Sequence, residues 1–409
     1  MGSSPTLLRR ARLLLLLFSS VVVSSSAAVV IFNVKDYGAV PDAKKDSAQA
    51  FMHAWRDACG EAEGEPRVLV PEGTFMVSPV VFQGPCKSPA VVFQVAGTVV
   101  ASEDLSEFSD DAWIEFDHVD GLLLTGGGKF DGRGSSAWQY NDCKHSSSCT
   151  LLPTSIKLSS VTNTTVRSIT SLNSKSFHLV VHGSRDVNLH SLTITAPADS
   201  PNTDGIHIGK SSNVNVGRSA IGTGDDCISI GPGSVGVTIT SVRCGPGHGI
   251  SVGSLGKYED EEDVAGVRVR NCTFQGTTNG VRIKTWPNSQ PSAASDMIFE
   301  NIVMDNVANP IIINQQYCAS SSCSNQSPSR VKISDVKFKN IRGVSLSKVA
   351  VNLLCSNLVP CKGVELGDIH LTYGSGGGGG DGGDDGGATA SCTNVDGLSL
   401  GNVIPPACL

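Results

Sequence analysis

The chain of 409 residues contains 45 glycines but only 5% aromatic and 17% charged residues, and its formal net charge is −7. This acidic balance argues against nucleic acid as a partner, because binding to the phosphate backbone depends on a surplus of Lys and Arg. An acidic polysaccharide remains compatible with the composition if basic residues are gathered in one place.

The N-terminal segment, residues 1–28, has the features of a secretory signal peptide. Three arginines, ending at Arg12, precede an apolar run from Leu13 to Val23 and a stretch of small residues from Ser24 to Ala28. This is the order of a signal peptide and its cleavage site. A membrane anchor is the weaker interpretation, because the apolar run is shorter than the roughly 20 residues that span a bilayer. We therefore expect an exported protein, extracellular or in a cell wall, with no membrane partner.

After a segment from Asp46 to Ala62 that has the pattern of a helix, the chain is dominated by short β-branched runs separated by Gly, Asn, Asp and Ser. From residue 187 these runs repeat the pattern apolar-x-apolar-x-x-apolar-x-apolar, with starts at Val187, Val214, Val237, Val267, Met297, Val331 and Val364. Alternation on both sides of a two-residue step is typical of two short strands joined by a bend. A third run follows in five of the repeats, at residues 206–208, 228–230, 250–252, 281–283 and 311–313.

Three strands in every repeat indicate a solenoid, in which each coil stacks on the next and the coils bury one continuous apolar column. An antiparallel sandwich is the alternative, but a sandwich does not require a recurring three-strand unit. We therefore predict an all-β fold, a right-handed parallel β-helix, in a single domain of residues 29–409. The Gly/Asp-rich segment 374–387 is too polar to pack, and we expect a disordered loop there.

All thirteen cysteines follow the predicted signal peptide, and disulfides persist in exported proteins. Six pairs of neighbours are candidates for bridges: Cys59–Cys86, Cys143–Cys149, Cys227–Cys244, Cys318–Cys323, Cys355–Cys361 and Cys392–Cys408. Cys272 is left over, and its place in a strand indicates a buried thiol. Zinc is the competing interpretation, but the chain has no C-x-x-C pair or H-x-x-x-H cluster.

Three sequons for N-glycosylation occur in the chain. Two of them, at Asn163 and Asn271, have the full acceptor pattern. A third, at Asn325, is weakened by the proline at position 328. We expect glycans at the first two positions.

Alignment of the third runs brings ionisable residues into register. Asp204, Asp226 and His248 each stand two residues before such a run and are each 22 residues apart. Since neighbouring coils lie about 4.8 Å apart, these three should form a column, with Asp225 beside them in the turn. His207, Arg282 and Lys284 alternate with apolar residues, so they should point outward on the same face.

This set of groups suits the hydrolysis of an acidic sugar polymer. Glycoside hydrolysis needs one carboxyl group that protonates the leaving oxygen and another that activates water. Crowded carboxylates do not ionise together, so one of them should keep its proton to a higher pH. Arg282 is suited to bind a uronate carboxylate through two hydrogen bonds, and Lys284 adds a second cation.

Four short segments resemble the signature of family 28 glycoside hydrolases, in order and spacing: Asn202-Thr-Asp-Gly205, Gly224-Asp-Asp-Cys227, Gly247-His-Gly249 and Arg282-Ile-Lys284. The last segment is similar to that of polygalacturonases in particular. The resemblance extends from about Phe32 to the C-terminus and includes Gln316-Tyr-Cys318. Taken whole, the chain resembles the plant, pollen-type exopolygalacturonases.

The resemblance implies a role for each matching residue. Asp225 would be the general acid, while Asp204 and Asp226 would together activate the water, with inversion at the anomeric carbon. His248 would tune the acid or the sugar ring near it. Substrate binding would fall to Arg282, Lys284, Tyr317 and His207, and the Cys227–Cys244 bridge would brace the catalytic turn. The implied substrate is homogalacturonan, and the implied enzyme is a monomer that needs no cofactor or metal.

Three alternatives stay open at this point. Exo action, which releases galacturonate from a chain end, rests on overall resemblance, and an endo-acting polygalacturonase is the alternative. A pectate lyase would use the same fold with calcium, which carboxylates such as Asp204, Asp225 and Asp226 suit as ligands. A non-catalytic pectin-binding wall protein would be expected if a catalytic aspartate were missing, and none is.

Overall fold

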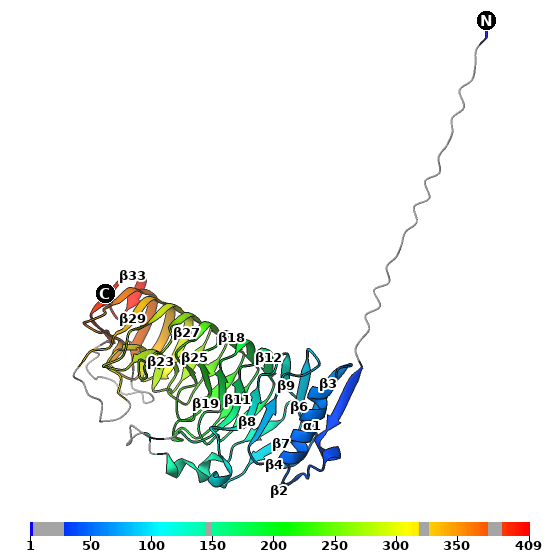
Figure 1. Cartoon of the computed structure of the whole chain (residues 1–409). Coiled ribbons are helices and arrows are strands. Elements are labelled where there is room, and N and C mark those ends of the chain that lie inside the picture. The colour runs from blue at the N-terminus through cyan, green and yellow to red at the C-terminus, as the bar shows by residue number, and fades with distance from the viewer. Residues whose placement is uncertain (3–27, 142, 144–148, 150, 319–326, 375–386) are drawn as a thin grey trace.

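Figure 1 shows the chain as an elongated stack of strands, in a computed structural model that describes residues 1–2, 28–141, 143, 149, 151–318, 327–374 and 387–409. Nearly all of the predicted signal peptide, most of the Gly/Asp-rich segment, and the residues Cys323 and Asn325 lie outside the described residues. No helix of the described part is long and apolar enough to cross a membrane.

The strands form two parallel ladders along the stack. In the described residues, one ladder has eleven strands: β5 (Val80–Gln83), β8 (Ala112–Asp117), β11 (Thr154–Ser159), β14 (Leu179–His182), β17 (Ile206–Gly209), β20 (Ile228–Ile230), β23 (Ile250–Leu255), β26 (Asn279–Thr285), β28 (Asn309–Asn314), β30 (Val349–Leu354) and β32 (Thr389–Thr393). We call this ladder the third-strand sheet, because it holds the third strand of each coil.

The other ladder holds the first and second strands of each coil, which share one sheet around the bend between them. Its strands are β1 (Val29–Asn33), β2 (Asp42–Asp46), β3 (Glu65–Val70), β4 (Thr74–Val77), β6 (Val91–Val95), β7 (Thr98–Ala101), β9 (Leu122–Thr125), β10 (Lys129–Asp131), β12 (Thr162–Arg167), β13 (Thr170–Leu172), β15 (Arg185–His190), β16 (Thr193–Thr195), β18 (Ser212–Gly217), β19 (Ala220–Gly222), β21 (Val235–Thr240), β22 (Arg243–Cys244), β24 (Val264–Arg270), β25 (Thr273–Gln275), β27 (Ser292–Val307), β29 (Val331–Ser345), β31 (Cys361–Tyr373) and β33 (Val395–Ile404).

The fold is the predicted right-handed parallel β-helix. Every strand pair in the described residues whose register is known is parallel, for instance β17 with β20 and β20 with β23. The antiparallel sandwich is therefore wrong. Since parallel partners need a crossover, the rest of each coil supplies the connection from one strand to the next.

The core is a column of aliphatic side chains inside the stack. Ile206, Ile228, Ile250 and Val281 lie directly above one another in the third-strand sheet, and each is 0% exposed. Burial of one such side chain stabilises the fold by about 1.5–3 kcal/mol. The alternation in the sequence therefore fixes which residues of each strand remain outside for chemistry.

The bend between first and second strands uses a left-handed residue in successive coils. Ser191, Arg218, Ser241 and Asn271 have φ between +47° and +57°. One such residue turns the chain from the first strand into the second without interrupting the stack. In later coils, β27 and β29 run through the bend as single long strands, with Asn301 and Asn340 in the same conformation. The predicted pair of short strands is merged there, because the ladder hydrogen bonds continue past the bend.

A helix covers the N-terminal end of the column. This helix, α1 (Ala48–Gly60), lies within the predicted segment and buries Phe51, Ala54 and Trp55 against the first strands. Trp55 packs on Phe82, with ring centroids 5.4 Å apart, and its indole N–H donates to the carbonyl of Gln83. Figure 1 shows the helix at this end of the stack. Its buried residues shield apolar side chains that an open end would expose. The short 3-10 helices are η1 (Val34–Tyr37), η2 (Leu105–Glu107), η3 (Gly134–Ser136) and η4 (Trp138–Tyr140).

The disulfide predictions are confirmed for the five pairs whose members are both described: Cys59–Cys86, Cys143–Cys149, Cys227–Cys244, Cys355–Cys361 and Cys392–Cys408. The sixth predicted pair includes Cys323, outside the described residues. Cys272 is a free, buried cysteine, as its place in the strand pattern predicted.

Candidate functional site

The predicted column of ionisable residues lies where three neighbouring strands of the third-strand sheet begin. Asp204 precedes β17, Asp226 precedes β20 and His248 precedes β23. Backbone hydrogen bonds hold these turns in register: the N–H of Gly205 donates to the carbonyl of Asp226 over 2.9 Å. A Cβ at Gly249 would stand 2.2 Å from two carbonyl oxygens of the next coil, so only glycine permits that close approach.

Asp226 is the most heavily bonded carboxylate of the group. Its Oδ1 accepts from Ser251 Oγ at 2.8 Å and from Arg282 Nη2 at 2.9 Å, and its Oδ2 accepts from Lys284 Nζ at 2.8 Å. Burial raises the pKa of a carboxyl group, and Asp226 is only 1% exposed, but the neighbouring cations Lys284 and Arg282 outweigh burial and lower its pKa. Asp226 is therefore held in its ionised form.

Asp204 lies in the opposite situation. It is 6% exposed, and its Oδ2 accepts one hydrogen bond from Ser229 Oγ, at 2.7 Å. Burial, together with the nearby charges of Asp225 and Asp226, raises its pKa well above the usual value. The expectation that one crowded carboxyl keeps its proton to a higher pH thus falls on Asp204.

Ser229 and His207 connect to Asp204 through two consecutive hydrogen bonds. Nδ1 of His207 lies 2.8 Å from the same Ser229 Oγ, and the imidazole stacks on Phe177 with centroids 5.2 Å apart. Burial lowers the pKa of His207 to about 4, so the ring is neutral near pH 7. Since Ser229 has one proton and gives it to Asp204, His207 must donate its Nδ1 proton to Ser229.

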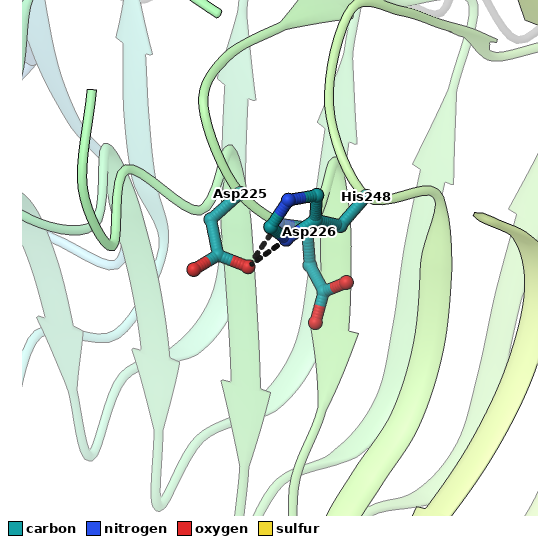
Figure 2. Close-up of side chains that lie close together, drawn as sticks. All are labelled: Asp225, Asp226 and His248. Atoms are coloured by element: carbon teal, nitrogen blue, oxygen red, sulfur yellow. Dashed lines mark hydrogen bonds and ion pairs between the residues drawn. The ribbon is translucent and has the colours of Figure 1, made fainter. Parts of the chain in front are cut away.

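Asp225 and His248 form the more open side of the group. Figure 2 shows the imidazole joined to the Asp225 carboxylate, whereas the Asp226 carboxylate is joined to neither. Nδ1 of His248 lies 2.9 Å from Asp225 Oδ1, and their side chains are 38% and 22% exposed. Asp225 is therefore the carboxyl group that an incoming ligand reaches most easily.

Arg282 and Lys284 extend the group along β26. Arg282 Nε also donates to Ser251 Oγ at 3.0 Å, and both cations face the ring of Tyr317, with Lys284 Nζ 5.1 Å from its centroid. Trp286 packs edge-on against the same ring at 5.6 Å. The sequence analysis predicted that these cations bind the substrate. In the structure both of them are hydrogen-bonded to Asp226.

Three residues of this network were missed by the sequence analysis: Ser229, Ser251 and Phe177. The serines lie in the same outward ladder as His207 and Arg282, one in each intervening coil. The available signal for the serines was a row of outward polar residues that joins His207 to Arg282. The charged residues alone were considered because serine is common on any solvent-facing strand.

Three potential metal ligands lie close together in this cluster, because donor atoms of Asp225, Asp226 and His248 are within 4.8 Å of one another. The donor set does not fit a divalent cation. Both oxygens of Asp226 already accept hydrogen bonds from the charged groups of Arg282 and Lys284, which would repel an added cation at this distance.

The remaining predicted residues surround this centre. Cys227 directly follows Asp226 and is bonded to Cys244 in the next coil. Asn163 and Asn271 are both exposed, as glycan acceptors must be, and Asn163 Nδ2 also donates to Asp120.

Comparison with known proteins adds independent information. The sequence model of the family described as Glycosyl hydrolases family 28 matches residues 59–402. An exopolygalacturonase of Platanus acerifolia is 47% identical over 92% of this chain and 97% of its own length, and one of Oenothera organensis is 47% identical over 89% and 98%. An endo-xylogalacturonan hydrolase of Aspergillus tubingensis has a similar structure, with a TM-score of 0.76 at 26% identity over 90% of this chain and 100% of that one.

Proposed function

The chain belongs to the glycosyl hydrolases of family 28, and from that membership we propose that it hydrolyses the α-1,4 bonds of homogalacturonan as an exo-acting polygalacturonase that releases galacturonate. The observation that carries the proposal is the cluster of Asp204, Asp225 and Asp226 beside two cations that can face an acidic sugar. Support for exo action comes from the two plant relatives, both named exopolygalacturonases.

Asp225 is the general acid in this proposal. It is the most open of the three carboxyl groups, and His248 beside it orients its oxygen. During bond cleavage Asp225 gives its proton to the glycosidic oxygen, and solvent returns a proton afterwards.

Asp204 and Asp226 activate the water. Asp226 is ionised and attracts the water proton, whereas the raised pKa of Asp204 favours its taking that proton up once the water attacks. Asp225 must be protonated and both of these groups ionised at the start of a cycle. Protonation of Asp225 removes one of the charges that raise the pKa of Asp204, which favours this state. Activity should still fall as the pH drops into the range where Asp204 becomes protonated.

Attack by this water inverts the anomeric carbon. Oxygens of Asp225 and Asp226 approach within 4.8 Å, closer than the roughly 6.5–9.5 Å usual for an inverting pair. Inversion therefore requires Asp226 to remain a base, and its hydrogen bonds to Ser251, Arg282 and Lys284 disfavour its attacking as a nucleophile.

Substrate binding is assigned to the outer cations and rings. Arg282 and Lys284 keep donor hydrogens beyond those given to Asp226, and these bind the uronate carboxylate. Tyr317 and the stacked His207 border the same face, where they contact the sugar.

The protein is proposed to act outside the cell as a monomer of residues 29–409, after removal of residues 1–28. Its five described disulfides suit that compartment. N-terminal sequencing of the secreted protein tests the cleavage, and its mass before and after deglycosylation tests Asn163 and Asn271.

The test of function is digestion of polygalacturonic acid by the purified protein in EDTA, with products separated by size. Galacturonate from the first time point, without the ultraviolet absorbance of an unsaturated sugar, is the expected result. Early mixed oligomers would replace exo by endo action. Activity that needs added calcium and yields the unsaturated product would establish a lyase instead.

A variant pair completes the test. Asp225→Asn should abolish product formation while the fold is retained. Asp335→Asn is the matched control, because Asp335 is exposed and has the left-handed conformation that Asn adopts equally well. Equal activity of both variants would refute the assignment of the acid.

A further inference from the structure

The bend between the first and second strands carries a line of basic side chains that the proposed chemistry does not use. We call it the basic ridge; its members are Lys129, Arg167, His190, Arg218 and Arg243. It lies on the other ladder of the coil, whereas the catalytic residues precede or belong to the third strands. Four of its members are exposed, and His190 is half-buried.

The register shows that the ridge is continuous from coil to coil. Arg167 lies directly opposite His190 in adjacent strands. On the other side of the bend, one ladder runs from Lys129 through Thr170, Thr193 and Ala220 to Arg243. Four steps of about 4.8 Å give this ladder a length of about 19 Å.

The charges of the ridge are not neutralised within the described part of the chain. None of its lysine or arginine side chains has an ion pair or side-chain hydrogen bond there, whereas exposed arginines elsewhere do, such as Arg56 with Asp57 and Arg185 with Asp186. The two rows of register-matched residues next to the bend, Lys129 to Arg243 and Arg167 to Thr240, contain no carboxylate. Asp131 and Asp186 lie farther along the same strands. In a protein with net charge −7, this local surplus is a distinct feature.

The positive potential reaches the half-buried member of the ridge. Burial lowers the pKa of His190, and the charges of Arg218 and Arg167 lower it further. His190 is therefore uncharged near pH 7, and it presents a neutral ring beside two arginines.

A hollow of about 480 Å³ opens between the arginines. Arg218 and Arg243 line it, together with the hydroxyl-bearing residues Ser191, Thr193 and Ser241. Guanidinium groups suit carboxylates, and the hydroxyl groups can donate to and accept from sugar hydroxyls. The hollow thus offers a partner for each of the two kinds of group that an acidic sugar presents, its carboxylate and its hydroxyls.

We propose that the basic ridge is a second binding site for a uronate-bearing polysaccharide, which anchors the enzyme to its polymer away from the point of cleavage. The inference rests on the proposed function, because the anchored polymer is the one that the catalytic site cleaves. A polymer is favoured over a single sugar because the ladder from Lys129 to Arg243 crosses five coils. Sugar is favoured over an acidic protein because hydroxyl groups line the hollow together with its arginines.

The experiment measures binding without turnover. In an Asp225→Asn background, the double variant Arg218→Asn/Arg243→Gln is compared with Arg185→Gln/Arg268→Gln, which removes the same charge elsewhere. Asn suits the left-handed backbone of position 218. Retention is measured by electrophoresis through gels that contain polygalacturonate, with short oligogalacturonides added to fill the catalytic site.

The ridge variant should bind polygalacturonate about tenfold more weakly and with a smaller salt dependence, while the control pair binds as the background does. Equal retention of all three proteins would overturn the proposal. Equal affinity of the background protein for polyglutamate would also overturn it, because the ridge would then be a general surface for acidic proteins.

A second measurement separates this inference from the proposed function. With Asp225 intact, the ridge variant should keep its kcat/KM on short oligogalacturonides and lose activity only on the polymer. Equal loss on both substrates would mean that the ridge is not a separate site. If the unmodified protein cleaves neither substrate, the proposed function fails, and the binding result still decides whether the ridge holds the polymer.

Discussion

Replacement of Ser229 by alanine tests which group sets the pH dependence of the enzyme. Ser229 is 3% exposed and gives its only proton to Asp204 over 2.7 Å. A hydrogen bond to a charged group stabilises it by about 1.5–3 kcal/mol, and each pKa unit corresponds to about 1.36 kcal/mol. Loss of this bond disfavours ionised Asp204, so the acidic limb of the kcat/KM profile should move up by about one to two pH units.

The assay is the release of reducing sugar from a short oligogalacturonide, measured as kcat/KM across the acidic range. Ser251→Ala is the informative partner, because Asp226 would still be bound by Arg282 and Lys284 and its limb should move less. Ser234→Ala removes a buried hydroxyl whose one hydrogen bond among the described residues goes to the carbonyl of Ile208, so it controls for loss of packing. A shift of the alkaline limb in Ser229→Ala would refute the reasoning, because Asp204 would then act as the acid.

Three other predictions concern stability and stereochemistry. Lys284→Met should destabilise the protein by about 3–5 kcal/mol at neutral pH, because it leaves buried Asp226 partly unpaired. Since Asp226 has a lowered pKa, this loss of stability, measured by chemical denaturation, should shrink as the pH falls and Asp226 takes up its proton. A loss that stays constant with pH would contradict the pairing. Replacement of Cys227 and Cys244 by alanine should cost about 3 kcal/mol, as expected for a bridge of sequence separation 17, and an unchanged melting temperature would show that the coils alone hold the turn. The first sugar released should have the inverted anomeric configuration by proton NMR, and retention would make a carboxylate the nucleophile.

Much of the fold was predictable because one rule determines it. In each repeat the alternating apolar residues face the column, and Ile206, Ile228 and Ile250 lie in register as the pattern requires. The buried Cys272 follows from the same alternation, and the helix within residues 46–62 was predicted from its own sequence pattern. The merging of strands around Asn301 was not predictable, because it depends on hydrogen bonds between coils rather than on local pattern.

The site was predictable in its membership but not in its wiring. The column of Asp204, Asp226 and His248 follows from equal spacing along the chain. That Lys284 and Arg282 bind Asp226 could not be foreseen, since a side chain of that length reaches either toward the substrate or across two coils. Which carboxyl has the raised pKa depends on those contacts, so it required coordinates.

The stacked register has a consequence for how a site of this kind can diversify. The loops that lead into the third strands differ in length, since residues 196–205 precede β17 but only residues 223–227 precede β20. Ile206 and Ile228 nevertheless lie opposite each other, because each coil is realigned by the hydrogen bonds of the coil before it. A difference in loop length in one coil therefore does not shift the register of the coils that follow. An insertion on this side can therefore add residues beside the aspartates while the aspartates keep their spacing.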